Sequence, residues 1–126
     1  MAEADPKLRG AGWVTGTRNH PGTSSELVAQ ITLDPSNVQY IFEFIAKTSN
    51  SSGANGSKRV KYLISVQRTT APAWSVTADL TDSFGALAVT WSFAMSGNAL
   101  QASATATSDD MSQGGFQGMG AEQSIT

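Results

Sequence analysis

Residues Val38 to Lys47 read Val-Gln-Tyr-Ile-Phe-Glu-Phe-Ile-Ala-Lys, and this segment gives the strongest indication of the fold class. Every second residue from Val38 to Ala46 is apolar, aromatic or β-branched, and this period of two predicts a β-strand with one buried face. The opposite face mixes Ile41 and Ile45 with a glutamine, a glutamate and a lysine. A strand that is apolar on part of its second face is typical of a central strand or of an interface.

The same alternation recurs on both sides of this segment, with turn residues between the runs. The hairpin signal Ser96-Gly97-Asn98 is the sharpest of these turns, because Gly97 and Asn98 tolerate positive φ. No segment shows helical periodicity. The sequence therefore predicts an all-β fold, an antiparallel β-sandwich or jelly roll with about six strands and up to two more from the chain ends. The further predicted strands cover residues 26–33, 59–68, 74–80, 87–95 and 99–107.

The two ends differ in composition from this body. Residues 1–23 combine Gly and Pro with few apolar residues, which predicts an extended N-terminal arm. Residues 107–126 form a Gly-rich C-terminal tail, whose isolated apolar residues either return to the sheet as a last weak strand or dock on a partner. The β-sandwich domain is predicted to span residues 24–106, with a polar surface loop at residues 48–57.

The composition excludes several classes of function. Charged residues make up 14% of the chain and the net charge is −2, whereas an average globular domain has about 25% charged residues. Such a chain has no overall basic field to attract nucleic acid or an anionic membrane. It contains no Cys, so disulfides, thiolate metal sites and thiol chemistry are excluded. The absence of a signal peptide or a long apolar run predicts synthesis in the cytoplasm.

Side chains suited to catalysis or metal binding are scarce. The single histidine, His20, lies in Arg18-Asn19-His20-Pro21 and is predicted to be a turn residue rather than the base of a hydrolase triad. Asp109 and Asp110 offer carboxylates to a hard cation, but the loop pattern of a calcium site is missing. The sequence therefore predicts no enzyme, no cofactor and no metal site.

A short basic cluster, residues 58–61, interrupts an otherwise sparsely charged chain. At strand spacing Arg59 and Lys61 share one face. A nucleic-acid surface needs a wider basic patch with stacking aromatic residues. An edge strand protected by its charges, or a subunit contact, explains the cluster without such a patch, and we favour that explanation.

Apolar side chains outside the predicted core strands are candidates for contacts with a partner. Trp13 lies in the predicted arm and Phe84 in a predicted loop, where each can anchor into a neighbouring subunit. Other apolar residues of the arm and tail join them. The candidate partner-binding residues are Leu8, Trp13, Val14, Phe84, Phe116 and Met119.

The order of these elements resembles small β-sandwich proteins of tailed-bacteriophage virions, among them head-decoration, head-fibre and tail-fibre components. The resemblance covers residues 24–106. It rests on Arg59-Val60-Lys61-Tyr62-Leu63-Ile64 after a polar loop, and on Ser96-Gly97-Asn98-Ala99-Leu100-Gln101 after an apolar strand. The tail departs from the pattern, because Gly, Gln and Ser stand where the closing strand usually has aromatic or β-branched residues.

This resemblance implies a non-enzymatic structural protein of the virion, whose arms contact other virion subunits. A capsid decoration or cement protein is the first hypothesis. A tail-fibre or receptor-binding module for a host glycan is the alternative, and a small hydrolase using His20 is a third. The resemblance also implies a homo-oligomer, and a trimer fits both phage hypotheses, although no heptad pattern specifies one. Nucleic acid and membranes are not expected as partners.

Overall fold

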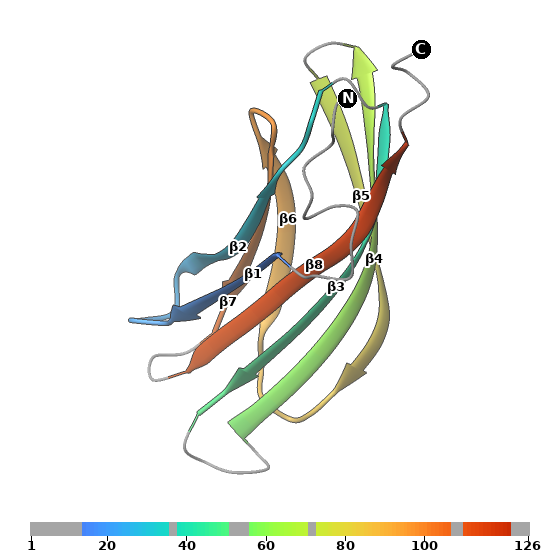
Figure 1. Ribbon diagram of the computed structural model, residues 1–126. Helices are drawn as coiled ribbons and strands as arrows, with labels where there is room; N and C mark the ends of the chain where they lie inside the picture. The colour runs from blue at the N-terminus through green and yellow to red at the C-terminus, as the bar shows by residue number, and fades with distance from the viewer. Residues whose placement is uncertain (1–13, 36–37, 51–55, 71–72, 107–109, 122–126) are drawn as a thin grey trace.

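The computed structural model describes residues 14–35, 38–50, 56–70, 73–106 and 110–121, which form two β-sheets packed face to face (Figure 1). No α-helix occurs among these residues, and none of them belongs to a helix long and apolar enough to cross a membrane. The predicted all-β antiparallel sandwich is confirmed. The strands are β1 (Val14–Asn19), β2 (Ser25–Thr32), β3 (Gln39–Ser49), β4 (Ser57–Thr70), β5 (Ala73–Phe84), β6 (Thr90–Ser96), β7 (Ala99–Thr105) and β8 (Met111–Ala121).

One sheet has five strands in the order β1-β8-β3-β4-β5, and the other has three in the order β2-β7-β6. Every neighbouring pair is antiparallel. Figure 1 shows the long strand β8 running between β1 and β3, so that the two ends of the described chain meet in one sheet. The smaller sheet covers one face of the larger, and the core lies between them.

Strand β3 is the centre of the larger sheet, as its pattern predicts. It pairs with β4 along one edge and with β8 along the other. Its inward side chains are almost completely buried: Tyr40, Phe42 and Phe44 are 1%, 0% and 0% exposed. Apolar residues at every second position therefore form the floor of the core.

Phe44 lies in the middle of an aromatic cluster. Its ring centroid is 4.8 Å from that of Phe116, 5.1 Å from Phe93 and 5.2 Å from Trp91. Tilted and edge-to-face pairs of this kind add about 0.5–1.5 kcal/mol each beyond the area that they bury. Ala104 of β7 is paired with Trp91 and fully buried, and its small side chain leaves room for the indole ring.

The predicted arm and tail both contribute strands to the sheet. β1 comes from the arm, and β8 comes from the segment predicted as a tail. Of the two alternatives for the tail, its return to the sheet is the one observed, but β8 is an inner strand and not a weak closing one. Its glycines explain this position. A Cβ on Gly114 would lie 2.4 Å from Cζ of Phe44, so a larger residue there would collide with the core ring.

Several strand boundaries differ from the sequence prediction, and in the predicted polar loop residues 48, 49 and 57 belong to β3 and β4. β5 continues to Phe84, where a loop from residue 81 was predicted, because its main chain keeps pairing with β4 as far as Arg59. The chain then turns at Gly85, whose φ is 122°. β6 begins at Thr90 rather than at Leu87. The predicted hairpin is confirmed, since Gly97, with φ of 59°, and Asn98 alone join β6 to β7.

Candidate binding surface

The outer face of the five-stranded sheet, which points away from the smaller sheet, carries side chains in rows that cross the strands. Strand pairing fixes each row, because residues directly opposite one another point to the same face. One row crosses all five strands and a second row lies beside it. The first row consists of Thr17, Gln113, Lys47, Arg59 and Phe84, and the second of Thr15, Gly115, Ile45, Lys61 and Asp82.

Large apolar side chains are exposed on this face. Ile41 and Ile45 of β3 are 46% and 44% exposed, and Leu63 of β4 is 47% exposed. Single exposed apolar residues are ordinary, but a group of them on adjacent strands marks a surface suited to a partner. The partly apolar second face of β3 is thus present in the structure as the sequence indicates.

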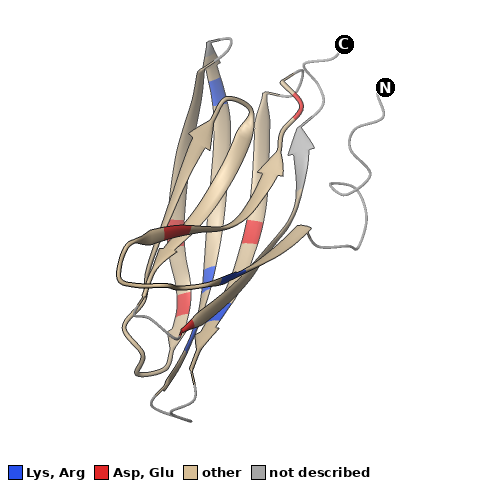
Figure 2. Ribbon diagram, turned by 90° about the vertical axis from the view of Figure 1, so that its left-hand side faces the viewer, with Lys and Arg blue, Asp and Glu red and all other residues tan. Residues whose placement is uncertain are grey.

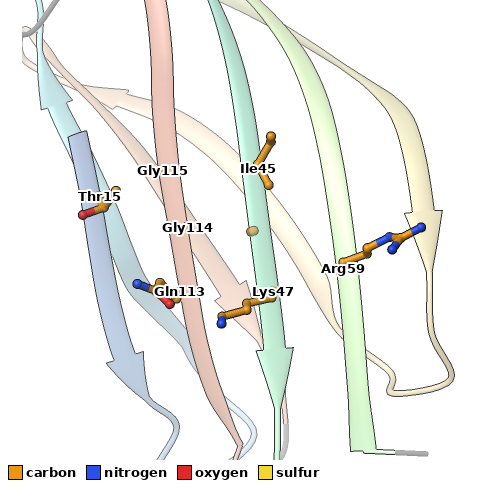
Figure 3. A pocket seen from close by; sticks show the side chains of 8 residues that line it. Thr15, Ile45, Lys47, Arg59, Gln113, Gly114 and Gly115 are labelled. Atoms are coloured by element: carbon orange, nitrogen blue, oxygen red, sulfur yellow. The ribbon is translucent and has the colours of Figure 1, made fainter. Parts of the chain in front are cut away.

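A hollow of about 400 Å³ lies in the outer face, across β1, β8, β3 and β4 (Figure 3). Gly115 has no side chain, and it lies between Thr15 of β1 and Ile45 of β3 in the same row. The missing side chain leaves a depression between those two. The residues that line this hollow are Thr15, Ile45, Ala46, Lys47, Arg59, Gln113, Gly114 and Gly115.

The two cations at the hollow differ in their surroundings. Figure 3 shows the Lys47 side chain pointing across toward β8, and the Arg59 side chain pointing away toward β5. Arg59 has partners there: its guanidinium lies 4.8 Å from the Phe84 ring centroid and its Nε lies 3.8 Å from Oδ2 of Asp82. Among the described carboxylates none forms an ion pair with Lys47.

The basic cluster does not lie on an edge strand, so the edge explanation is wrong, while the alternative of a subunit contact stays a prediction. β4 lies between β3 and β5, and β5 forms the edge. The charges instead make cross-strand pairs, Lys61 Nζ with Oε2 of Glu43 at 2.9 Å and Arg59 with Asp82. Because all four side chains are well exposed, such pairs contribute at most about 1 kcal/mol each. Figure 2 shows that charged positions are few along the strands as a whole.

Three of the predicted partner-binding residues are not tested by the structure. Leu8 and Trp13 lie outside the described residues. Met119 is opposite Ile41 in the pairing of β8 with β3, but its side chain lies outside the described part. Their role in binding a partner stays a prediction.

The other three occupy different environments. Phe84 is 67% exposed, the most exposed of the large apolar side chains described, and is open to a partner. Val14 is partly buried against the core, opposite Phe116. Phe116 is 0% exposed and packs on Phe42 and Phe44. In this fold Phe116 fills the core and has no exposed surface for a partner.

His20 follows β1 and its side chain enters the interior, where it is 2% exposed. Its Nε2 lies 2.8 Å from the Ser112 hydroxyl, which lies 2.7 Å from that of Thr48. Both hydroxyl-bearing residues are also buried, so His20 Nε2 and the two hydroxyls are hydrogen-bonded to one another inside the fold. His20 Nδ1 has no hydrogen-bond partner among the described atoms. The serine and histidine are adjacent as in a nucleophile–base pair, but no substrate reaches a wholly buried hydroxyl.

Asp110 is 1% exposed, and its Oδ1 accepts a hydrogen bond from Asn50 Nδ2 at 2.7 Å. Its main-chain carbonyl also accepts one from the His20 N–H. Asp109 lies outside the described residues. In the described part of the chain, no three His, Asp or Glu side chains come together as metal ligands would.

Sequence reasoning missed the hollow. Lys47 and Ile45 are visible in the sequence on the outer face of the predicted central strand, but their neighbours come from β1 and β8. The pair Gly114-Gly115 in the tail is the only local signal, since glycine inside a strand often marks a close approach or a missing side chain.

Comparison with known proteins gives one informative likeness. No protein-family model and no curated relative matches the chain. Among solved structures, the tailspike protein of the Acinetobacter phage vB_ApiP_P1 is similar in fold, with a TM-score of 0.51 and 19% sequence identity over 86% of this chain. The match spans 21% of the tailspike's length. At this identity the likeness shows a shared β-sandwich fold with one part of a phage tailspike.

Proposed function

We propose that this chain is a non-enzymatic structural module of a bacteriophage virion that associates with neighbouring subunits. The fold that it shares with part of a phage tailspike carries the proposal, and the virion resemblance of residues 24–106 agrees with it. Exposed apolar residues on the outer face, with Phe84 at its edge, supply a surface for subunit contacts.

The buried polar cluster supports the non-enzymatic part of the proposal. His20 is the single histidine of the chain, and in this fold its ring is enclosed with Ser112 and Thr48. A triad hydrolase needs its serine at a surface that the substrate can reach. Here the hydroxyl serves to satisfy buried polar groups.

Within the virion, decoration of the capsid is the first finer proposal. Its support is the small β body with an exposed sheet face and a further N-terminal segment. The second is a tail-fibre or receptor-binding module, supported by the hollow on the outer face and by the tailspike likeness.

The test is to purify particles of the phage that encodes the chain, separate heads from tails, and quantify the chain in each by mass spectrometry. Recovery with heads in many copies supports decoration, and recovery with tails supports the fibre proposal. A chain found in the infected cell but in neither fraction overturns the virion proposal.

A deletion tests the role of the N-terminal segment. Deleting residues 1–13 keeps every described strand, whereas deleting through residue 22 would also remove β1 and His20. We expect the shorter deletion to abolish incorporation into particles while the protein stays folded. Undiminished incorporation would show that the sandwich alone makes the contacts.

A further inference from the structure

We propose that the hollow on the outer face binds an acidic saccharide, a sugar whose ring carries a carboxylate. The inference rests on the proposed function, because it names a ligand class for the receptor-binding form of it. Three properties of the hollow support it: an unpaired cation, unpartnered polar groups at the rim, and an apolar floor.

The cation is Lys47. Nearby Lys61 and Arg59 already have carboxylate partners at 2.9 and 3.8 Å, in Glu43 and Asp82. The ammonium of Lys47, which points toward β8 over the hollow in Figure 3, has none among the described residues. Lys47 is exposed and therefore accessible to a ligand carboxylate, and a charge-assisted hydrogen bond is stronger than a neutral one.

The rim adds neutral hydrogen-bonding groups. Gln113 offers an amide that both donates and accepts, and Thr15 offers a hydroxyl. Both line the hollow, and neither side chain has a hydrogen-bond partner in the described part of the protein. Hydroxyl groups around a sugar ring need this mixture of donors and acceptors.

The floor is apolar. The backbone of Gly114-Gly115 forms it with the apolar side chain of Ile45 beside it, and the hollow of about 400 Å³ falls within the size of small-ligand sites. A pyranose ring presents C–H groups on its faces and hydroxyls around its edge. An apolar floor with a polar rim therefore matches one ring face, with the carboxylate directed to Lys47.

The topology disfavours an added peptide strand as the occupant. β8 and β3 already pair on both edges, so no main-chain donor or acceptor is free for strand addition below the hollow. A nucleic-acid strand needs a track of cations with stacking aromatic residues. Lys47 is one unpaired cation, and none of the described residues that line the hollow is aromatic.

The test is a titration of the full chain with trigalacturonic acid, in which amide chemical shifts are measured by NMR. The control ligand is the methyl ester of trigalacturonic acid, which keeps the sugar rings and removes the charge. Binding is expected to shift the amides of Gln113 and Gly115. The ester should bind at least about tenfold more weakly, and added salt should weaken binding of the acid.

Two variants and a matched control locate the site. Lys47→Gln removes the unpaired cation, and Gly115→Thr puts a side chain into the depression. Lys58→Gln makes the same charge change outside the hollow. Lys58 is opposite the buried Thr48 in the strand register, so it lies on the inner side of β4, whereas the hollow is on the outer side. Affinity for trigalacturonic acid should fall at least about tenfold in the first two and stay unchanged in the third.

Each outcome decides the question. Loss of affinity in both hollow variants, with amide spectra that stay dispersed, supports the proposal. The absence of binding, equal binding of acid and ester, or equal losses in Lys47→Gln and Lys58→Gln overturns it. Failure here leaves the virion proposal standing, because particle fractionation tests that separately.

Discussion

The hydroxyl of Ser112 holds together the buried polar cluster, because it contacts both His20 Nε2 and the Thr48 hydroxyl. Ser112→Ala leaves those two groups without this partner in the core, and an unsatisfied buried group costs about 1–3 kcal/mol. We expect the free energy of unfolding to fall by that amount in urea denaturation. Ser92→Ala, on the exposed side of β6, is the control and should change it by less than about 0.5 kcal/mol. Equal effects of the two substitutions would contradict a structural role for the cluster.

Because of Tyr62, we expect the free energy of unfolding to decrease at alkaline pH. Burial beside Phe93 raises the pKa of its phenol above the ordinary value of 10.0. The folded chain therefore holds the phenolic proton more tightly than the unfolded chain does. This contribution to stability is complete below pH 10.0 and is lost as the pH rises through the folded-state pKa.

Urea unfolding at pH 8 and at pH 11 measures this effect. The unmodified chain should lose more free energy of unfolding between the two pH values than Tyr62→Phe, which has no phenol to ionise. Identical losses in both proteins would show that Tyr62 titrates alike in the folded and unfolded chains.

Strand β8 depends on glycine to fit between its neighbours. A Cβ on Gly118 would lie 2.1 Å from the Ile41 carbonyl oxygen and 2.8 Å from Cα of Phe42, and the backbone cannot yield cheaply there. We expect Gly118→Ala to destabilise the fold by about 1–3 kcal/mol, as overpacking does. Gly22→Ala is the matched control, because nothing lies within 4 Å of a Cβ at Gly22. A thermal scan that finds the same Tm for both variants would contradict this account of β8.

The glycines of β8 also explain why β3 is easier to predict from the sequence than β8. β3 is evident from its alternation, because large apolar residues at every second position have no other good arrangement. In β8 the inner row is Ser112, Gly114, Phe116 and Gly118, so a single apolar residue marks a strand that is buried on one face. Small residues suffice there because the rings of Phe42 and Phe44 fill the space from β3. Inward and outward residues alternate in β8, but this alternation is not visible in the sequence as an alternation of apolar and polar residues.

The candidate surface was harder to predict for a related reason. Lys47 can be assigned to the outer face of β3 from sequence alone. Its lack of a partner depends on register, which places Gln113 on one side of it and Arg59 on the other. Arg59 in turn is held by Asp82 and Phe84 of β5. Neighbours from distant strands therefore determine which cation is free, and alternation within one strand does not contain that information.

Considered as one molecule, the sandwich depends on its first and last described strands, β1 and β8, to complete the larger sheet. β8 separates β1 from β3 and supplies Phe116 to the core. The predicted domain of residues 24–106 lacks both β1 and β8, and it would leave the long edge of β3 unpaired. An exposed edge of that length favours association with other chains.

We therefore expect residues 24–106 alone to be insoluble or to lack a cooperative unfolding transition, whereas the chain without residues 1–13 should unfold cooperatively like the full chain. Near-ultraviolet circular dichroism and urea unfolding of the two truncated proteins distinguish these outcomes, because native packing around Trp91 and Phe44 gives a fixed aromatic signal. If the 24–106 fragment unfolds cooperatively with the aromatic signal of the full chain, β8 would be an accessory to the sandwich. Removing β8 would then lower the free energy of unfolding only by the contribution of its own contacts, and the fold would not depend on a strand at that interior position.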